Sequence, residues 1–87
     1  MPYDATAAKL ADLYTHEFGG KPSGRYRIPE KLVKELMGRK RLYSEDRTAI
    51  ARELFELGFV LIDMDSFFVV MSSNAFVNYR RVSKEAL

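Results

Sequence analysis

One stretch, residues 44–72, constrains the fold more than any other part of the chain. It begins with Ser44, a good helix cap, and two acids follow in the first turn, where the helix dipole favours them. The acid of a capping box is missing, because Arg47 stands at its place. Gly58 suits the left-handed residue that ends many helices. The stretch predicts a helix from Ser44 to Gly58 with a buried stripe at Ile50, Leu54 and Leu57.

Two short apolar runs follow this helix, at residues 59–64 and 67–71, and both are rich in Val, Ile or Phe. The connection around Asp65 and Ser66 is short enough for an antiparallel hairpin. Neither run alternates cleanly between apolar and polar residues, so both faces of the hairpin are apolar. Such a hairpin has to be covered either by the chain's own helices or by a second copy of the chain.

The residues before this stretch predict two further helices, Asp4–Phe18 and Pro29–Met37, each ended by glycine. Between them, Arg25–Ile28 alternates charged and apolar residues, as a short edge strand does. The positions predicted to be buried are Ala7, Leu10, Ala11, Tyr14 and Phe18 in the first helix and Leu32, Val33, Leu36 and Met37 in the second.

Beyond residue 72 the pattern is weaker. Ser73 could cap a helical turn or two carrying Phe76 and Tyr79, or the segment could continue as an irregular tail, and it is predicted to return to the same core. The length suits one domain, residues 1–87. The predicted fold class is α+β, with three helices, a C-terminal antiparallel hairpin, and a short final helix or irregular tail from residue 73.

Charge is unevenly distributed along the chain, although the net charge is only +2. Residues 21–41 carry eight Lys or Arg against two Glu, whereas residues 42–66 carry six acids against two Arg. A polyanion is expected to meet the basic middle segment. The absence of Cys excludes disulfides and thiolate metal sites, and the apolar runs are too short to span a bilayer. We therefore expect a soluble cytoplasmic protein.

The order helix, short strand, helix, turn, helix, strand, tight turn, strand is similar to that of winged-helix (winged helix-turn-helix) proteins. Residues 49–71, AIARELFELGFVLIDMDSFFVVM, resemble the third helix and wing hairpin of that superfamily. The resemblance covers roughly the first four fifths of the chain. It implies a DNA-binding transcriptional regulator, or an accessory to a DNA-processing system, whose third helix enters the major groove and whose wing contacts the backbone or minor groove.

This resemblance assigns eight residues to DNA binding. The groove-facing candidates are Arg47, Thr48 and Arg52, the candidates that hold phosphates are Arg39, Lys40 and Arg41, and Arg25 and Arg27 would extend the same rim. The implied partner is double-stranded DNA. The expected assembly is a homodimer formed through the apolar hairpin or through the Ala-rich first helix.

Acidic residues in the same region favour an alternative. The third helix begins with Glu45 and Asp46, and the wing tip contains Asp63 and Asp65, where a DNA-binding wing is normally neutral or basic. Carboxylates repel phosphate. The alternative is therefore a protein–protein interaction module of the same fold, whose acidic helix and hairpin tip bind a basic protein partner.

No catalytic or metal site is expected. The single histidine, His16, has no Cys to pair with, and Asp63 and Asp65 flank a turn, where Asp is common. Residues 19–24, GGKPSG, lack the Gly-Lys-Ser/Thr ending of a phosphate loop because Pro22 follows the lysine. We expect no enzyme activity and no cofactor.

Overall fold

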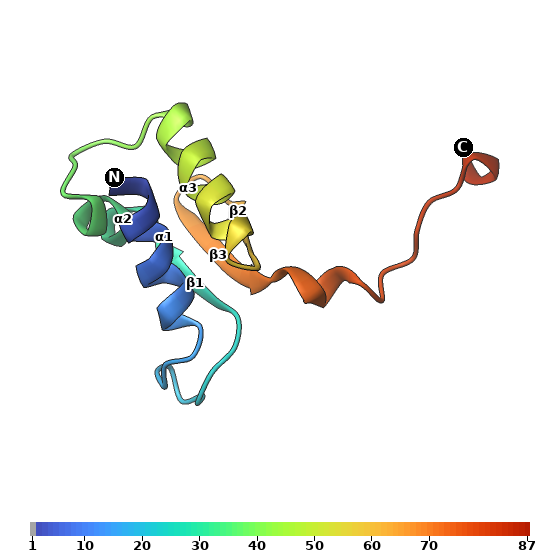
Figure 1. The fold of residues 1–87 in the computed structure, drawn as a ribbon, viewed down its shortest axis with the longest axis horizontal. Helices are drawn as coiled ribbons and strands as arrows, with labels where there is room; N and C mark the ends of the chain where they lie inside the picture. The colour runs from blue at the N-terminus through green and yellow to red at the C-terminus, as the bar shows by residue number, and fades with distance from the viewer. Residues whose placement is uncertain (1) are drawn as a thin grey trace.

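Residues 2–87, the part of the chain that the computed structural model describes, contain three α-helices and three β-strands (Figure 1). The order is α1 (Pro2–Leu13), β1 (Tyr26–Pro29), α2 (Glu30–Met37), α3 (Ser44–Glu56), β2 (Phe59–Asp63) and β3 (Phe67–Ser72), followed by two 3-10 turns, η1 (Ser73–Phe76) and η2 (Lys84–Ala86). The fold class is α+β, and the predicted hairpin and edge strand are both present.

The three strands form one antiparallel sheet in the order β1-β3-β2, so the last strand lies in the middle. Val70 of β3 pairs with Tyr26 of β1 on one side and with Leu61 of β2 on the other. Gly58 adopts the left-handed conformation that the sequence predicts, with φ 93°, immediately before β2 begins. The hairpin therefore follows α3 after only two connecting residues and lies against it.

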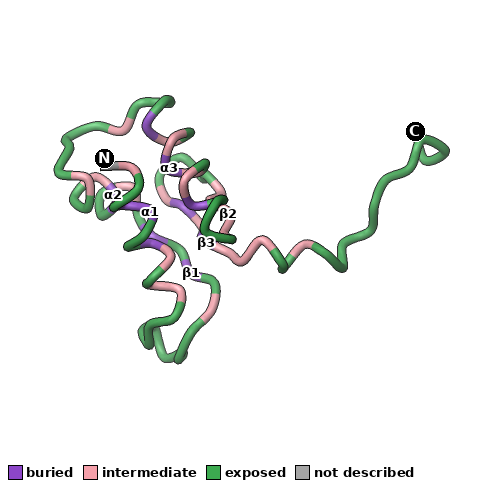
Figure 2. The backbone as a smooth tube through the Cα atoms, viewed as in Figure 1, coloured by how far each residue is buried: buried purple, intermediate pink, exposed green. Residues whose placement is uncertain are grey.

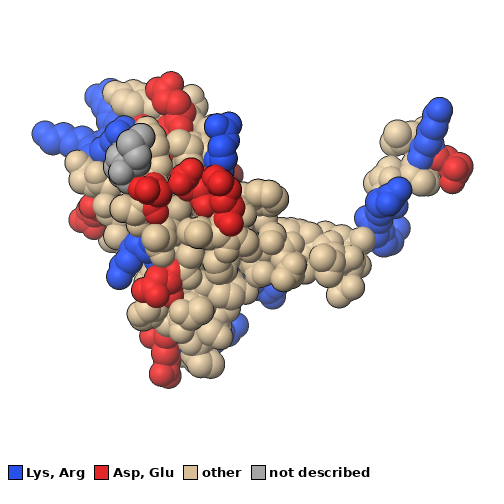
Figure 3. All heavy atoms as spheres, viewed as in Figure 1, with Lys and Arg blue, Asp and Glu red and all other residues tan. Residues whose placement is uncertain are grey.

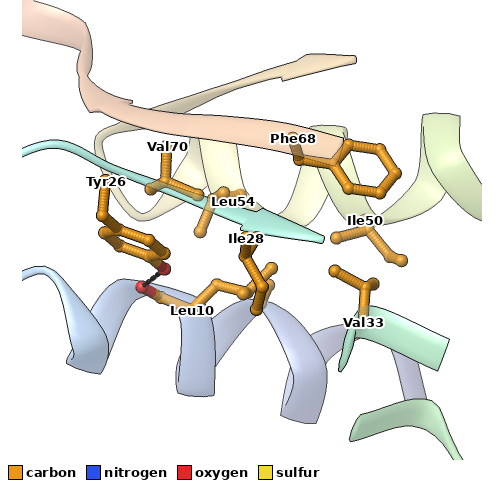
Figure 4. Close-up of a cluster of buried hydrophobic side chains, with 9 residues drawn as sticks. Leu10, Tyr26, Ile28, Val33, Ile50, Leu54, Phe68 and Val70 are labelled. Carbon is orange, nitrogen blue, oxygen red and sulfur yellow. Dashed lines mark hydrogen bonds between the residues drawn. The ribbon is translucent and has the colours of Figure 1, made fainter. Parts of the chain in front are cut away.

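The core lies between the helices and one face of the sheet (Figure 4). Burial alternates along β1 and β3, so Ile28 and Phe68 face this core while Arg27 and Val69 do not. The buried hydrophobic residues are Ala7, Leu10, Tyr26, Ile28, Val33, Ile50, Leu54, Phe68 and Val70. Each of the three helices contributes to this cluster, which holds them at fixed positions relative to the hairpin.

Helix α1 ends at Leu13, five residues before the predicted end at Phe18. The hydroxyl of Tyr26 donates a hydrogen bond of 2.5 Å to the backbone oxygen of Leu10, the carbonyl that the next helical turn would use. The N–H of Tyr14 bonds instead to Ala11, three residues back. Burial raises the pKa of Tyr26, which keeps this hydroxyl protonated as a donor.

Four residues predicted to be buried are exposed: Phe18, Leu32, Leu36 and Leu57. Helix α2 presents only Val33 fully to the core, because the eight-residue helix packs on β1, β3 and α1 along one side. It also starts one residue later than predicted, since Pro29 stays extended, with ψ 148°, as the last residue of β1. Leu57 lies after the last helical residue of α3, where the chain turns toward β2.

The segment after η1 does not return to the core. Residues 77–87, here called the C-terminal arm, are all exposed and extend away from the rest of the molecule (Figures 1 and 2). The 3-10 turn η1 is held at its start by the Ser72 hydroxyl, which accepts a hydrogen bond from the backbone N–H of Asn74. Phe76 and Tyr79 pack edge to face on each other, with ring centroids 5.2 Å apart.

Candidate functional site

The candidate site is the surface where the first turns of α2 and α3 meet the β2–β3 turn. Arg47 of α3 is anchored there by acids from both other elements. Its Nη1 donates to Oδ1 of Asp63 at 2.9 Å, and its Nη2 donates to Oε2 of Glu30 at the start of α2. The guanidinium lies over the ring of Phe68, 5.1 Å from its centroid. Only 17% of the Arg47 side chain is exposed, so this residue joins three elements and does not project outward.

The β2–β3 turn is shaped by the same aspartate. Oδ1 of Asp63 also accepts the backbone N–H of Asp65 at 2.8 Å, and Asp65 adopts a left-handed conformation with φ 71°. Asp tolerates this conformation better than most residues do. The carboxylate of Asp63 is thus occupied by contacts within the fold, to Arg47 and to the backbone of Asp65. The carboxylate of Asp65 itself is exposed and forms no ion pair with any residue that the structure describes.

Together these side chains form what we call the hairpin-tip cluster: Glu30, Lys34, Arg47, Asp63 and Asp65. Lys34 completes it through its Nζ, which lies 3.6 Å from Oε1 of Glu30, as the spacing along α2 predicts. Three acids stand against two bases, so the cluster carries a formal charge of −1. The start of α3 is therefore slightly acidic on the side that faces the hairpin.

A second buried junction lies at Asp46, whose residue surface is only 1% exposed. Its Oδ1 accepts hydrogen bonds from the Tyr3 hydroxyl at 2.7 Å and from Nη1 of Arg39 at 2.6 Å. Its Oδ2 accepts the backbone N–H of Tyr43 at 2.8 Å. The Tyr3 hydrogen bond, the Tyr43 N–H and the Arg39 charge lower the pKa of Asp46, and the same bond to Asp46 raises the pKa of Tyr3.

This junction corrects the predicted start of α3. The cap residue is Tyr43, not Ser44, and the acid three residues later is Asp46. Its carboxylate accepts the N–H of the cap residue, which is the reciprocal half of a capping box. Counting from Ser44 placed Arg47 at that position, so a capping interaction predicted to be absent is present one residue earlier.

The eight residues assigned to DNA binding do not lie on one surface. Arg39 and Arg47 form ion pairs, Arg39 with the buried Asp46 and Arg47 with Asp63. Four others are exposed around the start and outer side of α3: Lys40, Arg41, Thr48 and Arg52. The remaining two are Arg27, which belongs to β1, and Arg25, which immediately precedes this strand.

Arg27 lies opposite Val69 in the sheet, on the face that points away from the core. Arg25 lines a shallow cavity of about 300 Å³ with Tyr14, Lys21 and Met71, beside the end of β3. Neither position adjoins the α3 surface, and the continuous basic rim expected from the sequence is therefore split.

Several functional side chains gave no signal in the sequence. Tyr3 bonds to a residue 43 positions away, and Glu30 bonds to one 17 positions away, so no local pattern reports either contact. Exposed apolar side chains at Phe55 and Met64 were also not predicted as surface features. Phe55 lies on α3 and Met64 at the hairpin turn.

Other parts of the described chain offer little chemistry. Within residues 2–87, no group of three His, Cys, Asp or Glu side chains is placed to hold a metal ion. His16 donates from Nδ1 to the backbone oxygen of Asp12 at 2.8 Å, a local contact just beyond the end of α1. None of the helices that the structure describes combines the length and apolarity needed to cross a membrane.

No protein-family model, no curated protein and no solved structure matches the chain.

Proposed function

We propose that this chain is a winged-helix domain that recognises a basic segment of a partner protein and carries out no catalysis. The architecture is supported by the element order and by the strand order β1-β3-β2, in which the hairpin directly follows the third helix. Because one fold can serve unrelated functions, the ligand has to be argued from the surface.

The observation that carries the proposal is that Arg47 forms ion pairs with Glu30 and Asp63. In DNA-reading domains of this architecture, the third helix and the wing face the grooves and phosphates. Here the arginine at that junction is ion-paired with Glu30 and Asp63, and the exposed carboxylate of Asp65 adds a charge that no described residue neutralises. A cationic ligand gains from this charge, whereas a phosphate backbone is repelled by it.

The hairpin tip also offers an apolar contact. Met64 stands between the two aspartates of the turn and is 49% exposed. Protein interfaces combine apolar anchors with a polar rim, and Met adapts its shape to different partners. The partner segment is therefore expected to carry Lys or Arg next to an apolar residue.

Selection of a displayed random-peptide library against the purified chain tests this proposal. We expect enriched peptides to combine Lys or Arg with an apolar residue. We expect them to bind the Asp65→Asn variant several-fold more weakly, since an exposed charge pair contributes up to about 1 kcal/mol. Asparagine tolerates the left-handed backbone at this position, so the turn is preserved.

The matched control is Glu35→Gln, which removes one exposed carboxylate from α2 outside the hairpin-tip cluster. It should leave peptide binding unchanged. Peptides without Lys or Arg, or an equal loss of binding in both variants, would contradict the proposed surface.

Duplex DNA remains the second candidate ligand because of four exposed residues. Lys40, Arg41 and Arg52 form no ion pair with any described residue, and Thr48 lies between Arg41 and Arg52 in the sequence. Three cations in reach of phosphates could support weak, salt-sensitive binding. In that case, replacing Lys40 and Arg41 with Ala would reduce the salt dependence of binding, by about one unit of slope per lost contact.

A further inference from the structure

The C-terminal arm carries both apolar and basic side chains, and they are exposed to solvent. Val77, Tyr79 and Val82 are 73%, 65% and 69% exposed, respectively. Three bases stand against one acid in the arm, Arg80, Arg81 and Lys84 against Glu85, and no described residue forms an ion pair with any of the three bases. Figure 3 shows these cations on a segment that projects from the body. Large apolar side chains held in water beside unpaired cations favour contact with an acidic apolar surface.

The groove between α1 and α3 has the complementary properties. It encloses about 530 Å³, and its apolar lining includes Ala5 and Ala8 of α1 and Leu57 after α3. Glu53 and Glu56 border it from α3, and neither forms an ion pair with a described residue. Figure 3 shows acidic side chains gathered where α1 and α3 lie next to each other. The small alanine side chains leave room for another chain to approach the helix closely.

We propose that the C-terminal arm of one copy docks in the α1–α3 groove of a second copy, and that the second arm docks reciprocally in the first groove. The arm's apolar side chains would cover Ala5, Ala8 and Leu57. Its arginines would meet Glu53 and Glu56. The exchange is two-fold symmetric, the commonest arrangement for a homodimer.

Charge distinguishes this groove from the other uncovered apolar surface. The outer face of the sheet, with Val60, Ile62 and Val69, is only partly buried. It carries the exposed Arg27 directly opposite Val69, which repels a basic arm. The acidic groove attracts the same arm, so we assign the arm to the groove and not to the sheet.

The arm is also long enough to reach a neighbouring molecule. An extended chain spans at most about 3.3–3.6 Å per residue, so its eleven residues reach roughly 35–40 Å. The arm leaves the domain after η1 and points away from the body that carries the groove (Figure 1). Docking on a second copy therefore needs no reversal of the chain.

Sedimentation equilibrium with matched charge reversals tests this inference. The full chain is expected to form a dimer whose population rises with concentration. The arm variant Arg80→Glu/Arg81→Glu and the groove variant Glu53→Lys/Glu56→Lys should each raise the dimer dissociation constant by about tenfold or more, because each opposes like charges across the contact. The control Lys21→Glu/Lys31→Glu makes the same change in net charge as the arm variant, at exposed positions outside both surfaces, and should dimerise normally.

Mixing the two variants gives the decisive result. The reversed arm of one variant fits the reversed groove of the other, and the unchanged arm and groove also match, so a heterodimer should form at least as well as the wild-type dimer.

Deletion of residues 77–87 should leave a folded monomer, as checked by circular dichroism. A monomeric wild-type chain at all concentrations, a dimer that survives both reversals, or no recovery on mixing would overturn the proposal. An arm docked within its own chain would give no recovery on mixing. The surface tested here is separate from the hairpin-tip cluster, so either proposal can fail alone.

Discussion

Replacing Arg47 with Met is expected to lower the free energy of unfolding by about 2–3 kcal/mol and the melting temperature by roughly 10–15 °C. Met keeps the length and the apolar stem of the side chain but removes the guanidinium. Glu30 and Asp63 then lose their shared cationic partner, and the Phe68 ring loses the cation above it. The expected loss is smaller than for a fully buried pair because 29% of the Glu30 side chain and 43% of the Asp63 side chain remain exposed to water.

Arg52→Met is the matched control on the same helix. Arg52 is exposed and forms no ion pair with a described residue, so its replacement should change the free energy of unfolding by less than about 0.5 kcal/mol. Urea unfolding followed by circular dichroism measures both values. Equal, small effects of the two substitutions would mean that Arg47 is a free surface residue, and the argument against a groove-reading role for it would fail.

Replacing Asp46 with Asn is expected to lower the melting temperature at neutral pH by roughly 5–10 °C. The carboxylate accepts hydrogen bonds from Tyr3, Arg39 and the Tyr43 backbone while it is almost completely buried. Asparagine replaces one of the two accepting oxygens with an NH2 group, which is a donor. At least one of the three partners, which are all donors, would then face this NH2 group instead of an acceptor. The substitution also leaves the charge of Arg39 unpaired.

The effect of Asp46→Asn should depend on pH in one direction. Hydrogen bonds from Tyr3 and Tyr43 and the charge of Arg39 lower the pKa of Asp46 in the folded chain below its ordinary value of 3.8. Because the pKa is lower in the folded state than in the unfolded state, the ionised carboxylate stabilises the fold at pH values above the unfolded-state pKa. This stabilisation is lost progressively as the pH falls from there through the folded-state pKa. The difference in melting temperature between the wild type and the variant should therefore be largest near pH 6–7 and shrink below about pH 4.

Glu45→Gln serves as the control for this pH dependence, since Glu45 lies in the same turn of α3 but is exposed. It should lose only a weak interaction with the helix dipole. If the difference in melting temperature between the wild type and Asp46→Asn stayed constant from pH 7 to pH 3, the charge of Asp46 would not contribute to the stability of this junction.

Local patterns in the sequence were sufficient to predict which helices and strands form. The position of Gly58 and the two β-rich runs after it predicted where α3 ends and where the hairpin forms, because these signals act within a few residues. Gly38 likewise ends α2 in the left-handed conformation, with Arg39 N–H bonded back to Lys34. Boundaries were missed where a distant residue intervened, as Tyr26 does at the end of α1.

The site was less predictable because its basic residues look alike in the sequence. Arg47 and Arg52 lie five positions apart on one helix, yet only Arg47 has carboxylates from α2 and the hairpin within reach. Which arginine is neutralised depends on contacts 16 and 17 residues away, and these exist only after the chain has folded. The same holds for the exposed leucines of α2, whose spacing indicates burial although the small sheet covers only one side of the helix.

Fluorescence anisotropy of a labelled random-sequence DNA duplex tests the central claim, that the α3–hairpin surface recognises protein and not DNA, most directly. Non-specific binding by DNA-binding domains has dissociation constants of about 10⁻⁴–10⁻⁶ M at physiological salt and becomes tighter as salt falls. We predict no saturable rise in anisotropy at low salt up to a protein concentration of about 10⁻⁴ M. Saturable binding that weakens linearly on a log–log salt plot, and that is reduced by replacing Lys40 and Arg41 with Ala, would contradict the claim.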